Sequence, residues 1–191
     1  MGTKTAVVTG ATSGLGQAAA LALGAAGWRV LVVGRDAGRG AEVAKQAGNG
    51  SEFVKADLFS LADVRRLAGV LAEQAPALDL LVNNAGGVFS KGPATVDGLE
   101  QTFALNVAAP FTLTEGLLGA LEAGKGRVVN VVTGIQNGFS TKLEQVVGPK
   151  ATGGMFAYVR NKAVLLTLTR AQQQRHGARG ITFVALHPNI I

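Results

Sequence analysis

Cysteine is absent from the 191 residues of this chain. Its absence excludes disulfides, thiolate metal sites and cysteine nucleophiles together. Histidine is scarce as well, because His176 and His187 are the only two. Two isolated histidines without cysteine do not form a metal-binding pattern, so we expect no metal site.

Long uncharged apolar runs are also missing from the sequence. No stretch reaches the roughly 18 residues that a membrane span needs, and the amino terminus lacks the basic region and apolar run of a signal peptide. Position 6 is Ala, where a myristoylation motif needs Ser or Thr. We therefore expect a soluble, cytoplasmic protein with no membrane span.

Charged residues make up only 16% of the chain and apolar residues 48%, which is typical of a compact globular protein. The length fits a single domain over residues 1–191. The formal charge is +6, but the basic residues are scattered and no aromatic platform accompanies them. This charge favours an anionic small ligand, and we do not expect a nucleic-acid partner.

Short apolar, β-branched runs alternate with longer Ala- and Leu-rich segments along the chain. The expected strands are 5–9, 29–33, 52–56, 78–83, 127–132 and 181–186. The expected helices lie near 14–26, 38–47, 61–75, 97–122 and 155–176. Continuous apolar strands joined by crossover helices predict a Rossmann-type, doubly wound α/β fold with a parallel sheet of six strands.

The first expected strand leads into TGATSGLG (9–16), and a helix follows it. The glycines allow a sharp turn and a close approach to a bound group, while the helix N-terminus offers free N–H groups to a pyrophosphate. A glycine-rich turn that only packs is the alternative, but this position favours dinucleotide binding. The residues expected to contact the cofactor here are Gly10, Thr12, Ser13, Gly14, Leu15 and Gly16.

The second expected strand ends in GRD, which places Arg35 where this fold meets the adenosine ribose. A guanidinium pairs with a 2′-phosphate, whereas an acidic residue binds a 2′-hydroxyl. Arg35 therefore favours NADP(H) over NAD(H). Asp36 leaves NAD(H) open as the alternative, because a modest rotation could bring its carboxylate to a ribose hydroxyl.

Tyr158 is the only tyrosine of the chain, and Lys162 follows it four positions later. Residues at this spacing lie on the same side of a helix, so the phenol and the ammonium can approach each other. Taken alone, the spacing favours two side chains that merely share a helix face.

Several motifs in order resemble those of the short-chain dehydrogenase/reductase family. TGATSGLG resembles the family's TGxxxGxG, ADL (56–58) its adenine-contacting segment, and NNAG (83–86) its fourth-strand signature. LNV (105–107) resembles the segment with the active-site Asn, and YVRNK (158–162) the YxxxK motif. The stretch 97–118 and the spacing from Thr133 to Tyr158 are most similar to the retinol-dehydrogenase-like branch.

The resemblance implies a catalytic role for the Tyr158/Lys162 pair. Tyr158 would exchange a proton with the substrate oxygen while a hydride moves between the nicotinamide and the substrate carbon. Lys162 would hold the nicotinamide ribose and lower the pKa of Tyr158. Asn106 matches the family's relay position, and the alternative is that Asn106 caps or kinks its helix ahead of Pro110.

The remaining cofactor contacts are also implied by the resemblance. Asn84, Ala85 and Gly86 match the stretch that lines the cofactor ribose, and Asp57 with Leu58 match the adenine contacts. Asn83 is expected to tie adjacent strands together.

Thr133 stands where the family normally has Ser at the end of the fifth strand. Threonine keeps the hydroxyl that would bind the substrate oxygen, although a β-branched residue could also merely end a strand. The long irregular stretch 133–154 is a candidate active-site loop, and Ser140 within it is a weaker substitute for Thr133.

The resemblance also implies a further helix and a seventh strand after HPNII (187–191). Asn189 stands where the family commonly has Gly, and Ile191 falls near the position that meets the nicotinamide carboxamide. Without the later elements we expect 181–186 to be an edge strand and the substrate pocket to lack a wall.

The implied activity is an NADP(H)-dependent oxidoreductase that interconverts a carbonyl and a secondary alcohol on a small, fairly apolar substrate. The alternative is an NADP(H)-binding module with little or no turnover, because the closing segment is absent. The resemblance further implies a homodimer formed through the helices at 97–122 and 155–176.

Overall fold

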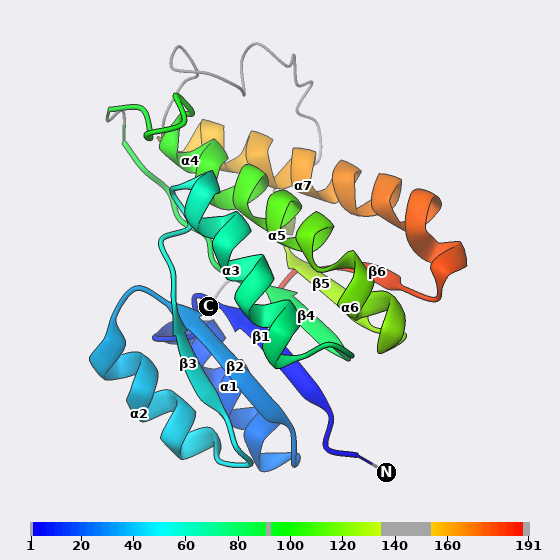
Figure 1. Cartoon of the computed structure of the whole chain (residues 1–191). Coiled ribbons are helices and arrows are strands. Elements are labelled where there is room, and N and C mark those ends of the chain that lie inside the picture. Colours follow the sequence, from blue (N-terminus) through cyan, green and yellow to red (C-terminus); the bar gives the residue numbers. More distant parts are fainter. Residues whose placement is uncertain (1, 91–92, 135–153, 189–191) are drawn as a thin grey trace.

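The computed structural model describes residues 2–90, 93–134 and 154–188. A parallel sheet of six strands lies at its centre, in the order β3-β2-β1-β4-β5-β6 (Figure 1). Every neighbouring pair is parallel. The Rossmann-type, doubly wound fold predicted from the sequence is confirmed, and the strand order reverses between β1 and β4, where such sheets bind ligands.

All six strands predicted from the sequence are present, with ends that shift by at most two residues. The strands are β1 (Thr5–Thr9), β2 (Arg29–Gly34), β3 (Glu52–Lys55), β4 (Leu80–Asn83), β5 (Arg127–Val131) and β6 (Thr182–Leu186). The helices are α1 (Gly14–Ala25), α2 (Ala37–Ala47), α3 (Leu61–Gln74), α4 (Gln101–Phe103), α5 (Ala109–Gly116), α6 (Leu118–Ala123) and α7 (Gly154–His176). A π-helical segment (Ala104–Ala108) joins α4 to α5, and a short 3-10 turn (Gly177–Arg179) follows α7.

Apolar side chains cover both faces of the sheet, as successive residues of a strand point to opposite sides. Val7 of β1 belongs to the core beneath α3 and α5, whereas its neighbour Val8 belongs to the core beneath α1 and α2. Figure 1 shows α1 and α2 on one side of the sheet and α3, α5 and α7 on the other. This double burial explains why the strands read as continuous apolar runs.

The single helix predicted over 97–122 is wrong in detail. The helical structure begins at Gln101, after Glu100 accepts hydrogen bonds from the N–H groups of the first turn, and it is interrupted by the π-helical segment and again before α6. Pro110 has no N–H and cannot donate to the carbonyl of Asn106, and the Asn106 side-chain amide donates to the carbonyl of Thr102 at 2.8 Å. The interruption therefore falls at Asn106, which agrees with the alternative of a distorted helix ahead of Pro110.

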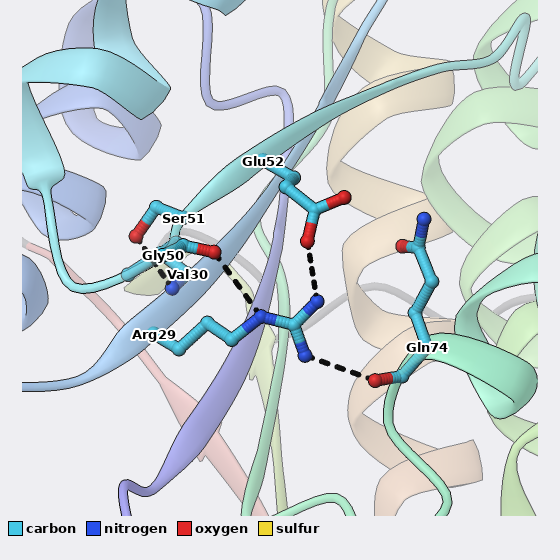
Figure 2. A network of polar contacts seen from close by, with 6 residues as sticks. All are labelled: Arg29, Val30, Gly50, Ser51, Glu52 and Gln74. Atoms are coloured by element: carbon cyan, nitrogen blue, oxygen red, sulfur yellow. Dashed lines mark hydrogen bonds and ion pairs between the residues drawn. The ribbon is translucent and has the colours of Figure 1, made fainter.

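The amino ends of the strands, opposite the site described below, are tied together by Arg29 (Figure 2). Its guanidinium donates to the carbonyl oxygens of Gly50 and Gln74 and forms a 2.6 Å ion pair with Glu52. One side chain thus connects the start of β2, the start of β3 and the end of α3.

Across the described ranges, no helix combines the length and the apolar character that crossing a membrane requires.

Candidate active site

A pocket of about 430 Å³ opens at the carboxyl ends of the central strands, at the point where the strand order reverses. Twelve of the residues predicted to form the site line this pocket: Gly10, Thr12, Ser13, Leu15, Gly16, Arg35, Leu58, Asn84, Ala85, Gly86, Tyr158 and Lys162. Gly14, Asp57, Asn106 and Thr133 do not line it. Ile191, Ser140 and most of the predicted loop 133–154 lie outside the described residues.

The three glycines of the first turn are required for different structural reasons. Gly10 has a φ of 65° and packs so closely on Ala85 that a Cβ there would lie 2.9 Å from the Ala85 Cα. A Cβ on Gly16 would clash with the carbonyl of Gly10 and the side chain of Asn84. Gly14 has a φ of 54°, with no atom within 4 Å of a Cβ position. Two of these glycines therefore serve the packing of β1, α1 and β4, and Gly14 serves the backbone conformation.

The N-terminus of α1 faces this turn without an acidic group. Ser13 is its N-cap residue, its side chain makes no capping hydrogen bond among the described residues, and the first turn of α1 has no acidic side chain. Unpaired N–H groups and the positive end of the helix dipole favour an anion at such a terminus. The turn can therefore hold a pyrophosphate.

Asn84 is held in the pocket wall by the end of β1. Its side-chain amide donates to the carbonyl of Thr9 at 2.9 Å. The hydroxyl of Thr9 accepts hydrogen bonds from the N–H groups of Asn84 and Ala85, each at 3.1 Å. These contacts fix the backbone that follows β4 against the glycine turn.

Asn83 faces away from the pocket and ties β4 to β5, as the sequence predicts. Its amide donates to Asn130 Oδ1 at 2.8 Å and to the hydroxyl of Thr114 at 3.1 Å. The Asn130 amide in turn donates to Thr169 of α7 at 2.9 Å. This buried polar chain connects two strands with α5 and α7.

Arg35 lies at one end of the pocket, with its guanidinium carbon 5.6 Å from the centre of the Phe59 ring. The Asp36 carboxylate is bound by Arg39 instead. It caps α2 by accepting a hydrogen bond from the N–H of Arg39 at 3.0 Å, and it forms an ion pair with the Arg39 side chain at 2.7 Å. These contacts with Arg39 lower the pKa of Asp36 below its ordinary value. Arg35 is thus the group that this segment offers to the pocket.

Asp57 lies beside this end of the pocket and is exposed. Its carboxylate accepts a hydrogen bond from the N–H of Phe59 at 3.1 Å, and its own N–H donates to Asp63 at 2.6 Å. These bonds shape the loop after β3 and place Leu58 and Phe59 in the pocket wall.

Tyr158 and Lys162 lie at the other end of the pocket, on α7. The Lys162 side chain is only 2% exposed, and its Nζ donates to the carbonyl of Val131 at 2.7 Å. Burial lowers the pKa of Lys162 to about 8, and it raises the pKa of Tyr158. The expectation that Lys162 lowers the pKa of Tyr158 is therefore wrong in this structure, because burial is what shifts the phenol and Nζ is bound to Val131.

Asn106 and Lys162 converge on Gly86, although Asn106 is not itself in the pocket wall. A Cβ on Gly86 would lie 2.8 Å from Asn106 Oδ1 and 3.2 Å from Lys162 Nζ. Asn106 also exchanges hydrogen bonds with the backbone of Gly87, donating at 2.8 Å and accepting at 3.3 Å. The π-helical segment therefore brings the Asn106 amide to the loop after β4, beside the lysine.

Thr133 is 8% exposed and lies just past the end of β5. The residues before it, Val131 and Val132, line the pocket, and so does Pro188 after β6. Thr133 therefore stands next to the pocket wall near the lysine.

Comparison with known proteins identifies the family. A sequence model of the short chain dehydrogenase family matches residues 4–191. Retinol dehydrogenase 14 of Mus musculus is 34% identical over 206 residues, which cover 98% of this chain and 61% of the relative. Polyprenol dehydrogenase of Mus musculus is 35% identical over 187 residues, which cover 93% of this chain and 56% of the relative. The chain thus spans less than two thirds of the length of these curated relatives.

The chain belongs to the short-chain dehydrogenase family. Its relatives place it in the retinol-dehydrogenase-like branch. Among solved structures, the complex of Pseudomonas aeruginosa RhlG with NADP is similar to this short-chain dehydrogenase at a TM-score of 0.81 and 30% identity, over 98% of this chain and 73% of that one. A metagenomic short-chain oxidoreductase in complex with NADP is similar at a TM-score of 0.79 and 26% identity, over 98% of this chain and 82% of that one.

Some residues in the pocket of this short-chain dehydrogenase were missed by sequence reasoning. Phe59 directly follows the ADL segment, so extending that motif by one residue would have found it. Leu105 and Pro188 lie within the LNV and HPNII segments, but neither was expected to contact the cofactor. The carbonyl of Val131 has no sequence signal at all, because any residue at that position supplies the same acceptor.

Proposed function

We propose that this chain is an NADP(H)-dependent oxidoreductase that interconverts a carbonyl and a secondary alcohol on a small, fairly apolar substrate. One observation carries the proposal. The glycine turn with its helix N-terminus, Arg35 and the Tyr158/Lys162 pair all line the same pocket. An extended dinucleotide with an anionic middle matches that arrangement.

The residues of the pocket fit a nicotinamide dinucleotide. The first turn of α1 would hold the pyrophosphate, Leu58 the adenine, and Asn84 to Gly86 with Lys162 the nicotinamide ribose. When bound, the nicotinamide supplies or accepts the hydride. The NADP found in the two similar structures supports the same class of cofactor.

The charges at the adenosine end support NADP(H) over NAD(H). Arg35 lines the pocket, and the Asp36 carboxylate is bound to the N-terminus of α2 and to Arg39. A guanidinium beside a 2′-phosphate gives a charge-assisted contact, whereas the Asp36 carboxylate already accepts its hydrogen bonds from Arg39.

Proton transfer to or from the substrate oxygen is proposed for the Tyr158 hydroxyl. Burial favours the neutral phenol, so the resting group can donate a proton to a carbonyl oxygen. Lys162, with its pKa near 8, remains largely protonated at pH 7 and would hold the nicotinamide ribose. Thr133 would bind the substrate oxygen, and Asn106, which lies beside the lysine at Gly86, would support Lys162.

The names of the relatives support an apolar substrate. They describe dehydrogenases of retinol and of polyprenol. A homodimer formed through the two segments 97–122 and 155–176, and a cytoplasmic location, stay predictions from the sequence. Light scattering coupled to gel filtration tests the dimer.

The activity is tested by following NADPH absorbance with a panel of apolar aldehydes and ketones, and NADP⁺ reduction with the corresponding alcohols. Calorimetric titration with NADPH on the same samples separates binding from turnover. Tyr158→Phe is expected to bind NADPH normally and to lose at least about a hundredfold in kcat, the scale of general acid–base catalysis. Turnover that survives Tyr158→Phe would contradict the assigned mechanism. Tight binding without any turnover would favour a binding module.

A further inference from the structure

His187 follows β6 directly and is one of two histidines in the chain. Its Nδ1 accepts a hydrogen bond from the N–H of Gly134 at 3.1 Å. Gly134 is the residue after Thr133. This bond therefore joins the ends of β5 and β6 beside the Thr133 hydroxyl, which is proposed to bind the substrate oxygen.

The contact continues the pairing of the two strands beyond the sheet. Val131 and Leu186 are partners in the β5–β6 register, and the N–H of Val132 donates to the carbonyl of Leu186 at 2.9 Å. At Gly134 the imidazole of His187 provides the acceptor. Thr133 is thus flanked by two N–H groups that are both fixed to the end of β6.

Gly134 is matched to the imidazole by close packing. A Cβ on Gly134 would lie 2.6 Å from Nε2 and 2.8 Å from Cδ2 of His187, too close for any other side chain without movement of the ring. Acceptance at Nδ1 also requires that this nitrogen carry no proton, which leaves the neutral ring with its proton on Nε2. The ring therefore has a defined place and tautomer.

We infer that His187 is a positioning residue: its Nδ1 holds Gly134 and thereby fixes Thr133 beside the pocket wall, to which Val132 and Pro188 belong. The inference rests on the proposed function, since the hydroxyl of Thr133 has to bind the substrate oxygen for its placement to matter. His187 itself touches neither substrate nor cofactor in this role. It acts only through the backbone that carries Thr133.

Two isosteric variants separate this role from a general need for histidine. In His187→Asn the side-chain oxygen occupies the place of Nδ1, whereas in His187→Gln it occupies the place of Nε2. His187→Asn is therefore expected to keep kcat/KM within about threefold of wild type. His187→Gln and His187→Ala are expected to lose about tenfold or more, because small misplacements of a positioning group are costly. Equal activities of the Asn and Gln variants would overturn the inference.

A double-mutant cycle tests whether His187 acts through Thr133. In the Thr133→Ala background, His187→Ala should reduce kcat/KM by less than about twofold further, because the hydroxyl that it places is gone. Undiminished loss in that background would show that His187 acts in another way. Thermal unfolding and NADPH titration of each variant check folding and cofactor binding.

The hydrogen bond itself is measured without turnover. Amide hydrogen exchange at Gly134 should be slow in wild type and in His187→Asn, and fast in His187→Ala and His187→Gln. A fast-exchanging Gly134 in wild type overturns the inference. If wild type binds NADPH and reduces no carbonyl compound, the proposed function fails and the positioning role falls with it. If wild type turns over and His187→Ala matches it, the positioning role alone fails.

Discussion

The ammonium of Lys162 lies 5.6 Å from the centre of the Tyr158 ring. It therefore faces the ring, and its hydrogen bond goes to the carbonyl of Val131 at 2.7 Å. In this geometry the lysine is a buried cation held by the sheet, and burial lowers its pKa to about 8. The stability of the protein should depend on pH for that reason.

We predict that Lys162 destabilises the folded state at neutral pH and that this penalty disappears in alkali. Its pKa is about 8 in the folded protein, against 10.5 for an ordinary lysine. Between these values the unfolded chain binds more protons than the folded one, so the free energy of unfolding rises with pH. The full difference corresponds to roughly 3 kcal/mol.

Urea unfolding of wild type and Lys162→Met from pH 7 to pH 10.5 measures this effect. The stability of the wild type relative to the Met variant should increase across the window, because Met carries no proton to lose. Parallel pH profiles for the two proteins would contradict a lowered pKa for Lys162.

Gly86→Ala is predicted to reduce both stability and turnover. The new Cβ would press on Asn106 Oδ1 at 2.8 Å and on Lys162 Nζ at 3.2 Å, and overpacking of this kind costs about 1–3 kcal/mol. Gly69→Ala, within α3, is the matched control, since a Cβ there has no atom within 4 Å. The control should be stabilised by about 0.5–1 kcal/mol through helix propensity. Thermal unfolding and NADPH-dependent turnover of the pair check the prediction, which fails if both alanines behave alike.

Cofactor preference should depend on Arg35 and, more weakly, on Phe59. Arg35→Ala is predicted to weaken NADPH binding by at least about tenfold and to leave NADH binding nearly unchanged, since it removes a charge-assisted phosphate contact. Phe59→Leu removes the aromatic face under the guanidinium, a contact worth about 0.5–1 kcal/mol at an exposed site. It should therefore weaken NADPH binding by only a few fold.

Calorimetric titration with both cofactors measures the two dissociation constants for each variant. Competition by 2′,5′-ADP and by ADP separates the phosphate contact from the rest of the nucleotide. Equal losses of NADPH and NADH binding in Arg35→Ala would place Arg35 elsewhere than at the 2′-phosphate.

The parts of the molecule that the sequence predicts are those set by local pattern. Runs such as RVLVV are apolar because both faces of the sheet are covered, so β2 is visible without any tertiary information. The glycine turn and the Tyr158/Lys162 spacing are equally local. The interruption of the helix near Asn106 is different, because the amide that stabilises it also binds Gly87, a residue from the loop after β4. Such a contact exists only once the chain has folded.

The pKa shifts of Tyr158 and Lys162 could not be predicted from the sequence for a related reason. The spacing of Tyr158 and Lys162 shows that the two groups can meet, and it does not show how deeply each is buried. Burial determines the direction of both shifts here. The division of the glycines between packing and backbone conformation likewise depends on Ala85 and Asn84, which lie far from them in sequence.

The hydrogen bond between Asn83 and Asn130 should contribute measurably to stability. Both side chains are buried, and the bond of 2.8 Å joins adjacent strands just below the pocket. Asn83→Ala leaves the Asn130 oxygen without this donor, and a buried unpaired polar group costs about 1–3 kcal/mol. Asn130→Ala should cost a similar amount, because it also removes the donor to Thr169.

The double variant, Asn83→Ala with Asn130→Ala, should be less destabilised than the sum of the single losses, since neither partner is then left unpaired across the strands. Urea unfolding of the four proteins gives the coupling energy, and strictly additive losses would show that the two amides do not act as a pair.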